Sequence, residues 1–236
     1  MADFQILPWD SDFFGMPTYS WYPESVTEDS LRSQRELLKS EGAHLCDIMV
    51  DAADTQSLSA IQAMGLLEMD AKTVYINTNP EAHAKADKRV LRQVGQVTEA
   101  LTELGVAAGA YSRFALDPKL PKDSFKKLYA IWIQNSIDRK LAFEVLITGT
   151  QHTPTGLITL GKKGDRGDIG LVSVQASARG QGVGSSLVRN SLSVFLRHGI
   201  NEVQVVTQGA NKEACGLYEK CGFVKERITH IFHLHL

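Results

Sequence analysis

Apolar positions in the first part of the chain alternate between the spacing of helices and that of strands. This pattern predicts five elements, bounded by short polar clusters, and then a polar linker over residues 79–88. The expected elements are an irregular strand over 9–22, a helix over 27–40, a strand over 44–51, a helix over 55–64 and a strand over 66–77.

The remainder of the chain continues the alternation of helices and strands, so we expect a mixed α+β fold. We place a domain boundary at the polar linker, with an N-terminal α/β domain over 1–88 and a second domain over 89–236. The second domain is expected to contain strands at 90–96, 142–148 and 155–160, a strand ending near 175, a strand at 202–208 and two final strands. Its expected helices are at 98–111, 185–198 and 211–221, with one more that ends near 138.

Composition narrows the class of protein. The 236 residues are 43% hydrophobic and 22% charged, which is typical of a folded chain. The net charge of −2 argues against a nucleic-acid partner. No apolar run approaches the roughly twenty residues of a membrane span, and the N-terminus lacks the layout of a signal peptide, so we expect a cytoplasmic protein with no membrane partner.

Cysteine and histidine positions give no metal-ligand pattern. The three cysteines form no C-x-x-C pair and are interpreted as reduced, buried thiols; they are Cys46, Cys215 and Cys221. A reactive thiol at Cys215 is the open alternative. His233 and His235 alternate in the last strand without an acidic or cysteine partner nearby in the sequence. We therefore expect them to face solvent, and we expect no metal.

A glycine-rich segment follows a Val-rich strand and precedes an amphipathic helix. Gly180, Gly182 and Gly184 stand before a helix that opens near Ser185, which is the arrangement of an anion cradle. A Walker loop would need a Lys after the last glycine, and a dinucleotide loop would need Gly-x-Gly-x-x-Gly; neither is present. A plain glycine turn that caps the helix is the remaining alternative.

Two motifs together resemble the coenzyme A signatures of the GNAT acyltransferases. Arg179-x-x-Gly182-x-Gly184 matches the first, and Asn211-x-x-Ala214 with Leu-Tyr-x-Lys-x-Gly-Phe over 217–223 matches the second. The resemblance implies a splayed central mixed sheet and acetyl-CoA or another short acyl-CoA as co-substrate. It assigns the co-substrate to Val172, Val174, Arg179, Gly180, Gln181, Gly182, Val183, Gly184, Ser185 and Asn211, the last of which is equally explained as a helix cap.

Tyr218 is the candidate catalytic residue. On its own it is a core tyrosine on an apolar helical stripe, but the resemblance implies that its phenol protonates the leaving thiolate. An oxyanion donor is expected from a backbone N–H near Val174. The base that takes the proton of the amine is not readable; it is Glu144, Tyr111, His230 or a chain of waters.

The N-terminal region carries a second resemblance. Trp9-Asp-Ser-Asp-Phe-Phe-Gly15, Tyr111-Ser-Arg-Phe114 and residues 128–136 are similar to the bacterial dTDP-fucosamine acetyltransferase family. This resemblance implies a dTDP-linked amino-dideoxy sugar as acceptor, made for surface polysaccharide. Arg113 and Tyr111 are the candidate substrate-binding residues, with Arg113 suited to the phosphates; a surface or helix-packing Arg is the alternative.

Two other functions stay open from the sequence. One is acetylation of another small amine or of a protein N-terminus, and the other is a non-catalytic acyl-CoA-binding module. The presence of both Tyr218 and the complete loop from Arg179 to Gly184 favours an enzyme. A homodimer is possible and is not decided by the sequence.

Overall fold

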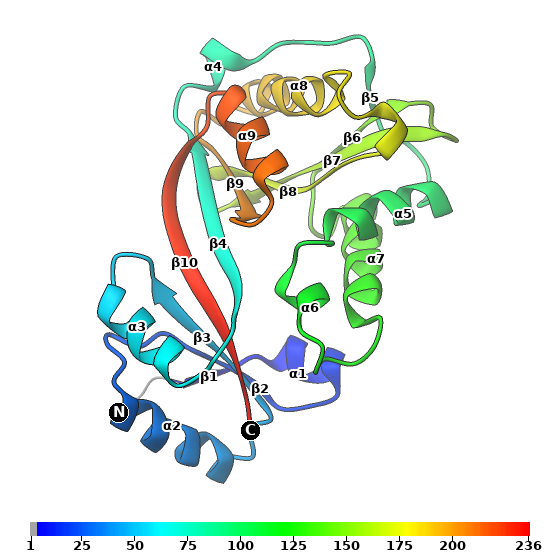
Figure 1. Cartoon of the computed structure of the whole chain (residues 1–236). Coiled ribbons are helices and arrows are strands. Elements are labelled where there is room, and N and C mark those ends of the chain that lie inside the picture. The colour runs from blue at the N-terminus through cyan, green and yellow to red at the C-terminus, as the bar shows by residue number, and fades with distance from the viewer. Residues whose placement is uncertain (1–3) are drawn as a thin grey trace.

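The computed structural model describes residues 4–236, which form one ten-stranded mixed sheet with helices packed against it (Figure 1). The strand order is β1-β2-β3-β10-β4-β9-β8-β7-β6-β5. The strands are β1 Phe4–Ile6, β2 Thr18–Trp21, β3 Leu45–Asp51, β4 Glu68–Asn77, β5 Val90–Arg92, β6 Glu144–Gly149, β7 Pro154–Lys163, β8 Arg166–Val174, β9 Val203–Gln208 and β10 Val224–His235. The α-helices are α1 Pro8–Phe14, α2 Glu28–Ser40, α3 Thr55–Ala63, α4 Pro80–His83, α5 Glu99–Ala108, α6 Arg113–Leu116, α7 Ser124–Ile137, α8 Val183–Arg197 and α9 Lys212–Lys220.

The strand expected over 9–22 is wrong in its first half, where the chain forms α1. Pro8 stands at the start of this helix, where its fixed φ suits a helical turn and its missing N–H costs nothing. The Ser11 hydroxyl donates to the Leu7 carbonyl, and Gly15 ends the helix at φ +68°. Only the four residues of β2 are extended. The aromatic residues over 9–14, which favour a strand by composition, lie in helix α1 instead.

Apart from the C-terminal strands, the other expected elements are confirmed within a few residues, with two short helices added. Helix α4 lies inside the predicted linker, and α6 lies between the predicted second-domain helices. Strand β7 extends three residues beyond its predicted end, to Lys163, and β8 begins at Arg166. They leave a tight hairpin whose turn contains Gly164 at φ +61°.

The C-terminus forms one long strand where the sequence predicted two. The place beside β9 is taken by β4, which comes from the N-terminal block and pairs antiparallel with both β9 and β10. In Figure 1, β4 and β10 run side by side from one half of the molecule to the other. The boundary at residue 88 stays a prediction, but the sheet is continuous across the two blocks.

The two blocks repeat one motif that is not evident in the sequence. The series β2-α2-β3-α3-β4 and β8-α8-β9-α9-β10 have the same order, and the strand order β2-β3-β10-β4-β9-β8 is symmetric about the β10–β4 pair. Both β2–β3 and β8–β9 pair in parallel. An approximate two-fold axis therefore relates the two halves.

Equivalent residues of the two motifs are 157 positions apart in the sequence, both at the turns and in the strand register. Gly42 and Gly199 end the first helices of the two motifs, and Gly65 and Gly222 end the second, all at positive φ. Lys72 pairs with Thr229 on the axis itself. Because the paired positions share apolar character and turn glycines rather than identity, the repeat escapes sequence comparison.

The two motifs differ at the turn that leads into the first helix. In the N-terminal motif, β2 reaches α2 through a turn without glycine, and Thr27 closes a capping box with Ser30. In the C-terminal motif, the corresponding connection contains Gly180 and Gly182. The second motif alone therefore keeps the glycine loop.

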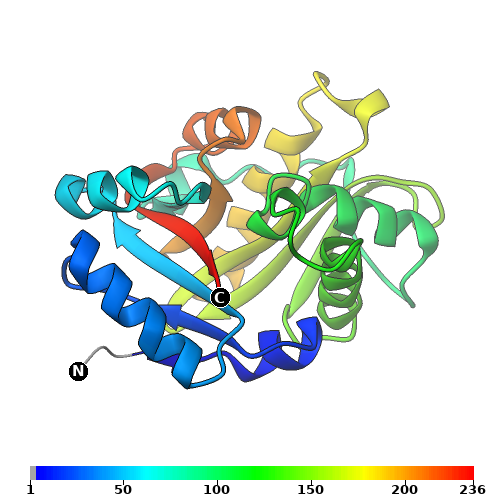
Figure 2. The same cartoon turned by 60° about the horizontal axis from the view of Figure 1, so that its bottom comes forward.

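Three large hydrophobic clusters hold the longer helices against the sheet, and a smaller fourth cluster contains Phe14, Leu45 and Leu120. Helices α8 and α9 contribute to one cluster with the strands of the C-terminal motif, α5 and α7 to a second cluster with β6, β7 and β8, and α2 and α3 to a third with β3 and β10. Figure 2 shows α5–α7 and the N-terminal helices over different parts of the sheet. Within residues 4–236, no helix combines the length and apolar character needed to cross a membrane.

Candidate functional site

The site begins where the parallel strands β8 and β9 separate. They pair only at three positions, the last of which is Ile169 with Val205. Beyond that point β8 continues against β7, and β9 continues against β4. A gap with unpaired strand edges therefore opens in the middle of the sheet, as the family resemblance implied.

A bulge lies in β8 at the start of this gap. Its register against β7 shifts between Ile158 and Leu160, so β8 carries one extra residue. The Leu171 amide donates to the Thr159 hydroxyl at 2.8 Å. A Cβ on Gly170 would lie 2.8 Å from Thr159 Oγ1, so this position has no room for a side chain.

The glycine loop follows β8 and leads into α8. Gly180 and Gly182 adopt φ values of +74° and +75°, and Gly182 is the N-cap residue of α8. The first helical hydrogen bond runs from the Ser186 amide to the Gly182 carbonyl. The amides of residues 182–185 consequently have no acceptor within the helix and form a site for a negative group.

Arg179, which was expected to contact the co-substrate, makes two hydrogen bonds to the segment that precedes it. Its amide donates to the Ala176 carbonyl at 3.3 Å, and its Nε donates to the Val174 carbonyl at 3.2 Å. The cradle of amides therefore starts after Arg179. The Val174 carbonyl thus accepts one hydrogen bond from Arg179, and a contact between Val174 and a ligand stays a prediction.

Residues of the predicted linker support the loop, which the sequence did not indicate. Asp87 forms an ion pair with Arg89 at 2.7 Å. The Arg89 guanidinium donates to Ser186 Oγ at 2.6 Å, and Asp87 accepts from that hydroxyl at 2.7 Å. These contacts hold the pKa of the Asp87 carboxyl well below its usual value and fix the linker at the first turn of α8.

Helix α9 lies beside the glycine loop. The Asn211 side chain accepts from the Ala214 amide at 3.1 Å, so it is a helix cap, one of the two alternatives left open by the sequence. A Cβ on Gly184 would come within 3.2 Å of Leu217 Cδ2, which shows how closely α8 and α9 approach. The glycines of the loop thus serve both its backbone conformation and its helix packing.

Tyr218 is buried on the inner side of α9. Its ring lies 6.0 Å from the ring of Tyr75 and 6.0 Å from that of Phe223. Burial, with smaller effects from Cys215 and Cys221, raises the pKa of the Tyr218 phenol. The phenol therefore keeps its proton at neutral pH and is available as a donor.

A cavity of about 340 Å³ fills the gap between β8 and β9 and extends from α9 to α6 and α7. Tyr218 and Asn211 line it, as do Val172 of β8 and Arg113 of α6. The other lining residues are Asp70, Lys72, Ala108, Ser112, Phe114, Tyr129, Trp132, Lys163, Asp168, Ile169, Gly170, Leu171, Val206, Thr207, Gln208 and Ala214.

Charged side chains of both signs line this cavity. Burial raises the pKa of the Asp70 carboxyl to about 7, against the opposing effects of Arg113 and Lys72. Asp70 Oδ1 is buried without a hydrogen-bond partner among the described residues. Burial and the nearby cations Lys163 and Arg113 lower the pKa of the Lys72 ammonium, which shows that positive charge is crowded here.

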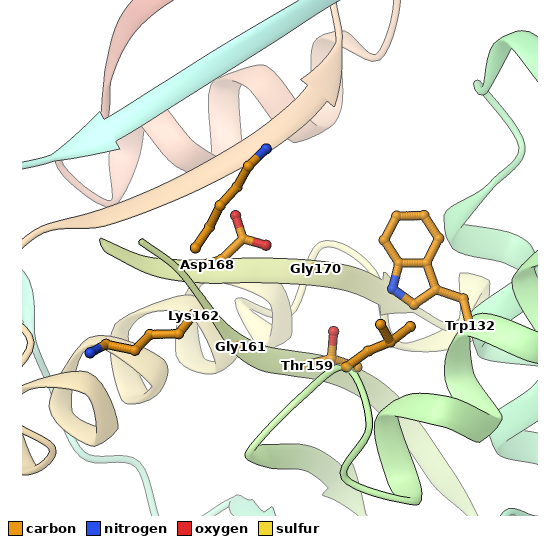
Figure 3. Close-up of a pocket in the computed structure, with 8 residues that line it drawn as sticks. Trp132, Thr159, Gly161, Lys162, Asp168 and Gly170 are labelled. Atoms are coloured by element: carbon orange, nitrogen blue, oxygen red, sulfur yellow. The ribbon is translucent and has the colours of Figure 1, made fainter. Parts of the chain in front are cut away.

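A smaller cavity of about 260 Å³ adjoins the first and shares Trp132, Lys163, Asp168 and Gly170 with it. Figure 3 shows the Trp132 indole beside Gly170. A Cβ on Gly170 would lie 3.7 Å from the indole nitrogen. The two cavities together extend the accessible space along β7 and β8.

Most of the sequence-predicted residues do not line the larger cavity; of the predicted co-substrate residues, only Val172 and Asn211 do. Tyr111 is 44% exposed and does not line it. Glu144 lies on β6 with Oε2 3.9 Å from Arg92 Nε, and His230 on β10 has Nδ1 3.0 Å from Glu68 Oε2. Val174 also lies outside the lining. The structure therefore supports none of Glu144, Tyr111 and His230 as a base in this cavity.

The residues that the sequence missed come from the N-terminal block and from a hairpin. Asp70 and Lys72 lie on β4, and Lys163 ends β7. No local motif marks them, because only the insertion of β4 beside β9 brings them to the site. Trp132 of α7 lines both cavities.

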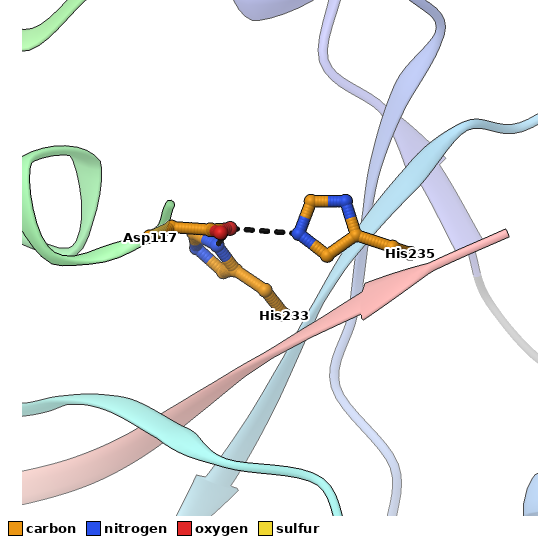
Figure 4. A group of neighbouring side chains, drawn as sticks. All are labelled: Asp117, His233 and His235. Atoms are coloured by element: carbon orange, nitrogen blue, oxygen red, sulfur yellow. Dashed lines mark hydrogen bonds and ion pairs between the residues drawn. The ribbon is translucent and has the colours of Figure 1, made fainter. Parts of the chain in front are cut away.

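The prediction that His233 and His235 face solvent is wrong. The His233 side chain is fully buried, and both histidines contact Asp117 Oδ2, at 2.5 Å and 2.7 Å (Figure 4). Their acidic partner lies more than one hundred residues away in the sequence, so local spacing could not reveal it. The three cysteines are buried and free, as expected.

Comparison with known proteins shows a likeness to acetyltransferases. The sequence profile of the acetyltransferase (GNAT) family matches residues 112–223. The spore coat polysaccharide biosynthesis protein SpsD of Bacillus subtilis is 24% identical over 137 residues, which are 58% of this chain and 47% of SpsD. Human N-alpha-acetyltransferase 30 is 31% identical over 70 residues, 30% of this chain and 19% of that protein.

The match to solved structures covers nearly the whole chain. A GCN5-related N-acetyltransferase from Sphaerobacter thermophilus superposes with a TM-score of 0.63 at 16% identity, over 98% of this chain and 76% of that one. At this identity the likeness concerns the fold. The chain spans half or less of the length of the two curated relatives named above. This chain therefore has the GNAT fold, and just under half of it matches the acetyltransferase (GNAT) family.

Proposed function

We propose that this protein transfers an acetyl or other short acyl group from coenzyme A to the amino group of a nucleotide-linked amino sugar. The observation that carries the proposal is the arrangement of one cavity. It opens at the gap between β8 and β9, has Tyr218 and the start of α9 at one end, and has Asp70, Lys72 and Arg113 at the other. Such a cavity has room for a thioester at one end and a charged acceptor at the other.

The donor end is supported by the loop. The amides of residues 182–185 suit the diphosphate of coenzyme A, because unpaired helical N–H groups stabilise negative charge. The unpaired edges of β8 and β9 beyond Ile169 suit the amides of pantetheine, which would pair with a strand edge. The thioester would then lie next to Tyr218.

The acceptor end is supported by charge. Lys72, Lys163 and Arg113 line the cavity together, and burial, with a smaller effect of repulsion from Lys163 and Arg113, lowers the pKa of the Lys72 ammonium. An acceptor that carries phosphate relieves this repulsion. The relative SpsD bears a name in polysaccharide biosynthesis, which agrees with a sugar nucleotide such as a dTDP-linked amino-dideoxy sugar.

Starting from the ammonium form of the acceptor, which must lose a proton before the nitrogen can attack, the chemistry requires three proton transfers. The amine attacks the thioester carbonyl, the C–N bond forms, and the C–S bond breaks with the electron pair on sulfur. Tyr218, which keeps its proton, donates it to the leaving thiolate. The nitrogen loses its surplus protons, one of which returns to the phenolate and the other of which passes to a base.

Asp70 is our candidate for that base. Its carboxyl lines the acceptor end of the cavity, and Oδ1 has no hydrogen-bond partner among residues 4–236. A pKa of about 7, raised mainly by burial, makes it a stronger base than an exposed carboxylate. None of the three bases suggested by the sequence lines this cavity.

The loop can be tested with two glycine substitutions on one helix. Gly182→Ala strains a left-handed residue at the N-terminus of α8 and shifts the adjacent amides, so we expect acetyl-CoA affinity to fall at least about tenfold. Gly199→Ala, also at positive φ but at the other end of α8, is the matched control. Equal affinities of the two variants by isothermal titration would refute the cradle.

Tyr218→Phe tests the proton donor. We expect turnover to fall by roughly 10²–10⁴ while acetyl-CoA affinity stays near that of the wild type, because only the hydroxyl is removed. Tyr19→Phe removes a phenol from the core of the N-terminal half and should leave turnover unchanged. A Tyr218→Phe enzyme with the wild-type rate would exclude Tyr218 from the reaction.

The pH dependence tests Asp70. Below a pH of about 7 the carboxyl binds a proton and cannot accept another, so kcat/KM should fall on the acid side. Asp70→Asn should lower turnover about 10²-fold or more and abolish this acid limb. Asp165→Asn, in the β7–β8 hairpin turn, should keep the wild-type profile, and an unchanged acid limb in Asp70→Asn would assign it to another group.

The acceptor is identified by a panel assay. Purified protein is offered acetyl-CoA with dTDP-amino sugars, with the same amino sugars lacking the nucleotide, and with peptides that carry a free N-terminus, and products are read by mass spectrometry. The proposal expects acetylation of the nucleotide sugars. Preference for the peptides would support the alternative suggested by the likeness to N-alpha-acetyltransferase 30, and binding of acetyl-CoA without any product would support a non-catalytic module.

A further inference from the structure

A buried cluster of histidine and aspartate lies behind the acceptor end of the cavity. His233 and His235 are two residues apart on β10 and project on the same face of the sheet, and Asp117 follows α6 directly. Figure 4 shows both imidazoles directed at the Asp117 carboxylate. One nitrogen of each histidine and one oxygen of Asp117 lie within 4.8 Å of one another.

The surroundings of His233 are unusual because both of its ring nitrogens face carboxylates. Nδ1 lies 2.5 Å from Asp117 Oδ2, and Nε2 lies 3.3 Å from Asp47 Oδ1. A neutral imidazole has one N–H, so one lone pair must point at a carboxylate oxygen. Nε2 indeed has no hydrogen-bond partner among the described residues, although it is fully buried.

A cation bound between the ligand atoms resolves this conflict. If the cation binds Nδ1, the proton of His233 lies on Nε2, where Asp47 can accept it. A carboxylate that holds the second nitrogen of a metal-bound histidine is a common outer partner of zinc sites. Asp47 is itself held by Arg113, whose Nη2 lies 3.0 Å from Asp47 Oδ2.

We propose that Asp117, His233 and His235 bind a divalent transition-metal ion of the zinc type, with Asp47 as the outer partner of His233. Two imidazole nitrogens and one carboxylate oxygen are ligands that suit zinc, and a fourth position remains for solvent. His235 is the most exposed of the three side chains, at 18%, so the cation has a route of entry on its side.

The position of the site defines its role. Asp117 follows the C-terminal end of the four-residue helix α6, and Arg113 stands at its N-terminal end, where it lines the cavity. A cation at Asp117 therefore fastens α6 to β10, and through Asp47 it also holds β3 and Arg113. The metal thus links β10 of one repeat to β3 of the other and positions Arg113. It takes no part in the reaction.

The test uses the full chain and zinc itself, and it needs no acceptor substrate. Protein is stripped with a chelator, dialysed, and titrated with Zn²⁺ in competition with a chromophoric chelator, and its melting temperature is recorded with and without the ion. We expect one zinc ion per chain and a higher melting temperature in its presence.

Variants separate this site from surface binding. His235→Gln and Asp117→Asn should each weaken zinc binding at least about tenfold, and Asp47→Asn should weaken it by about tenfold as an outer partner. His230→Gln, on the same strand but beside Glu68, is the matched control and should bind zinc like the wild type. Circular dichroism of the zinc-free variants establishes that each is folded.

The proposal is overturned if the stripped protein takes up no zinc, if zinc leaves the melting temperature unchanged, or if His235→Gln and Asp117→Asn bind it as the wild type does. Because the readouts are zinc binding and stability, the result does not depend on acyl transfer. A chain that binds zinc but transfers no acyl group would contradict the proposed function alone.

Discussion

The separation of β8 from β9 is the constraint on which the site depends. Three backbone pairs hold the strands together as far as Ile169 and Val205, and then each strand keeps a different neighbour, β7 or β4. The bulge at Gly170 and the close packing of Gly184 against Leu217 fall at the two sides of this gap. The gap is therefore built into the sheet and requires no movement of the chain to form.

The approximate two-fold repeat explains how the remainder of the site is assembled. The C-terminal motif keeps the glycine loop and carries Tyr218, whereas the N-terminal motif has a glycine-free turn and Ile61 at the equivalent position. The N-terminal motif contributes in another way, since β4 crosses to the partner motif and supplies Asp70 and Lys72 to the cavity. One repeat thus carries the donor end of the proposed site, and the other supplies part of the acceptor end.

Local patterns in the sequence were sufficient to predict features that depend on residues close together in the chain. The glycine spacing, the cap at Asn211 and the apolar stripe of α9 depend on residues a few positions apart, and the structure places them together as expected. The helix over Pro8–Phe14 was missed because its aromatic residues resemble a strand, although Pro8 and Gly15 mark its ends. The predicted fold class is confirmed.

Long-range pairing was not accessible to the same reasoning. The prediction of a second C-terminal strand was wrong because its place beside β9 is filled by β4, which lies more than one hundred residues earlier in the chain. For the same reason Asp70 was overlooked as a residue of the cavity, and Asp117 and Asp47 were not recognised as partners of His233. These contacts follow from sheet order, which no spacing between neighbouring residues encodes.

A crystal structure of the protein with bound acetyl-CoA is the most direct test of the central claim. The account predicts that the diphosphate accepts hydrogen bonds from the amides of residues 182–185, that pantetheine enters the gap between β8 and β9, and that the sulfur lies within hydrogen-bond reach of the Tyr218 hydroxyl. Coenzyme A bound elsewhere, or a thioester remote from Tyr218, would contradict it.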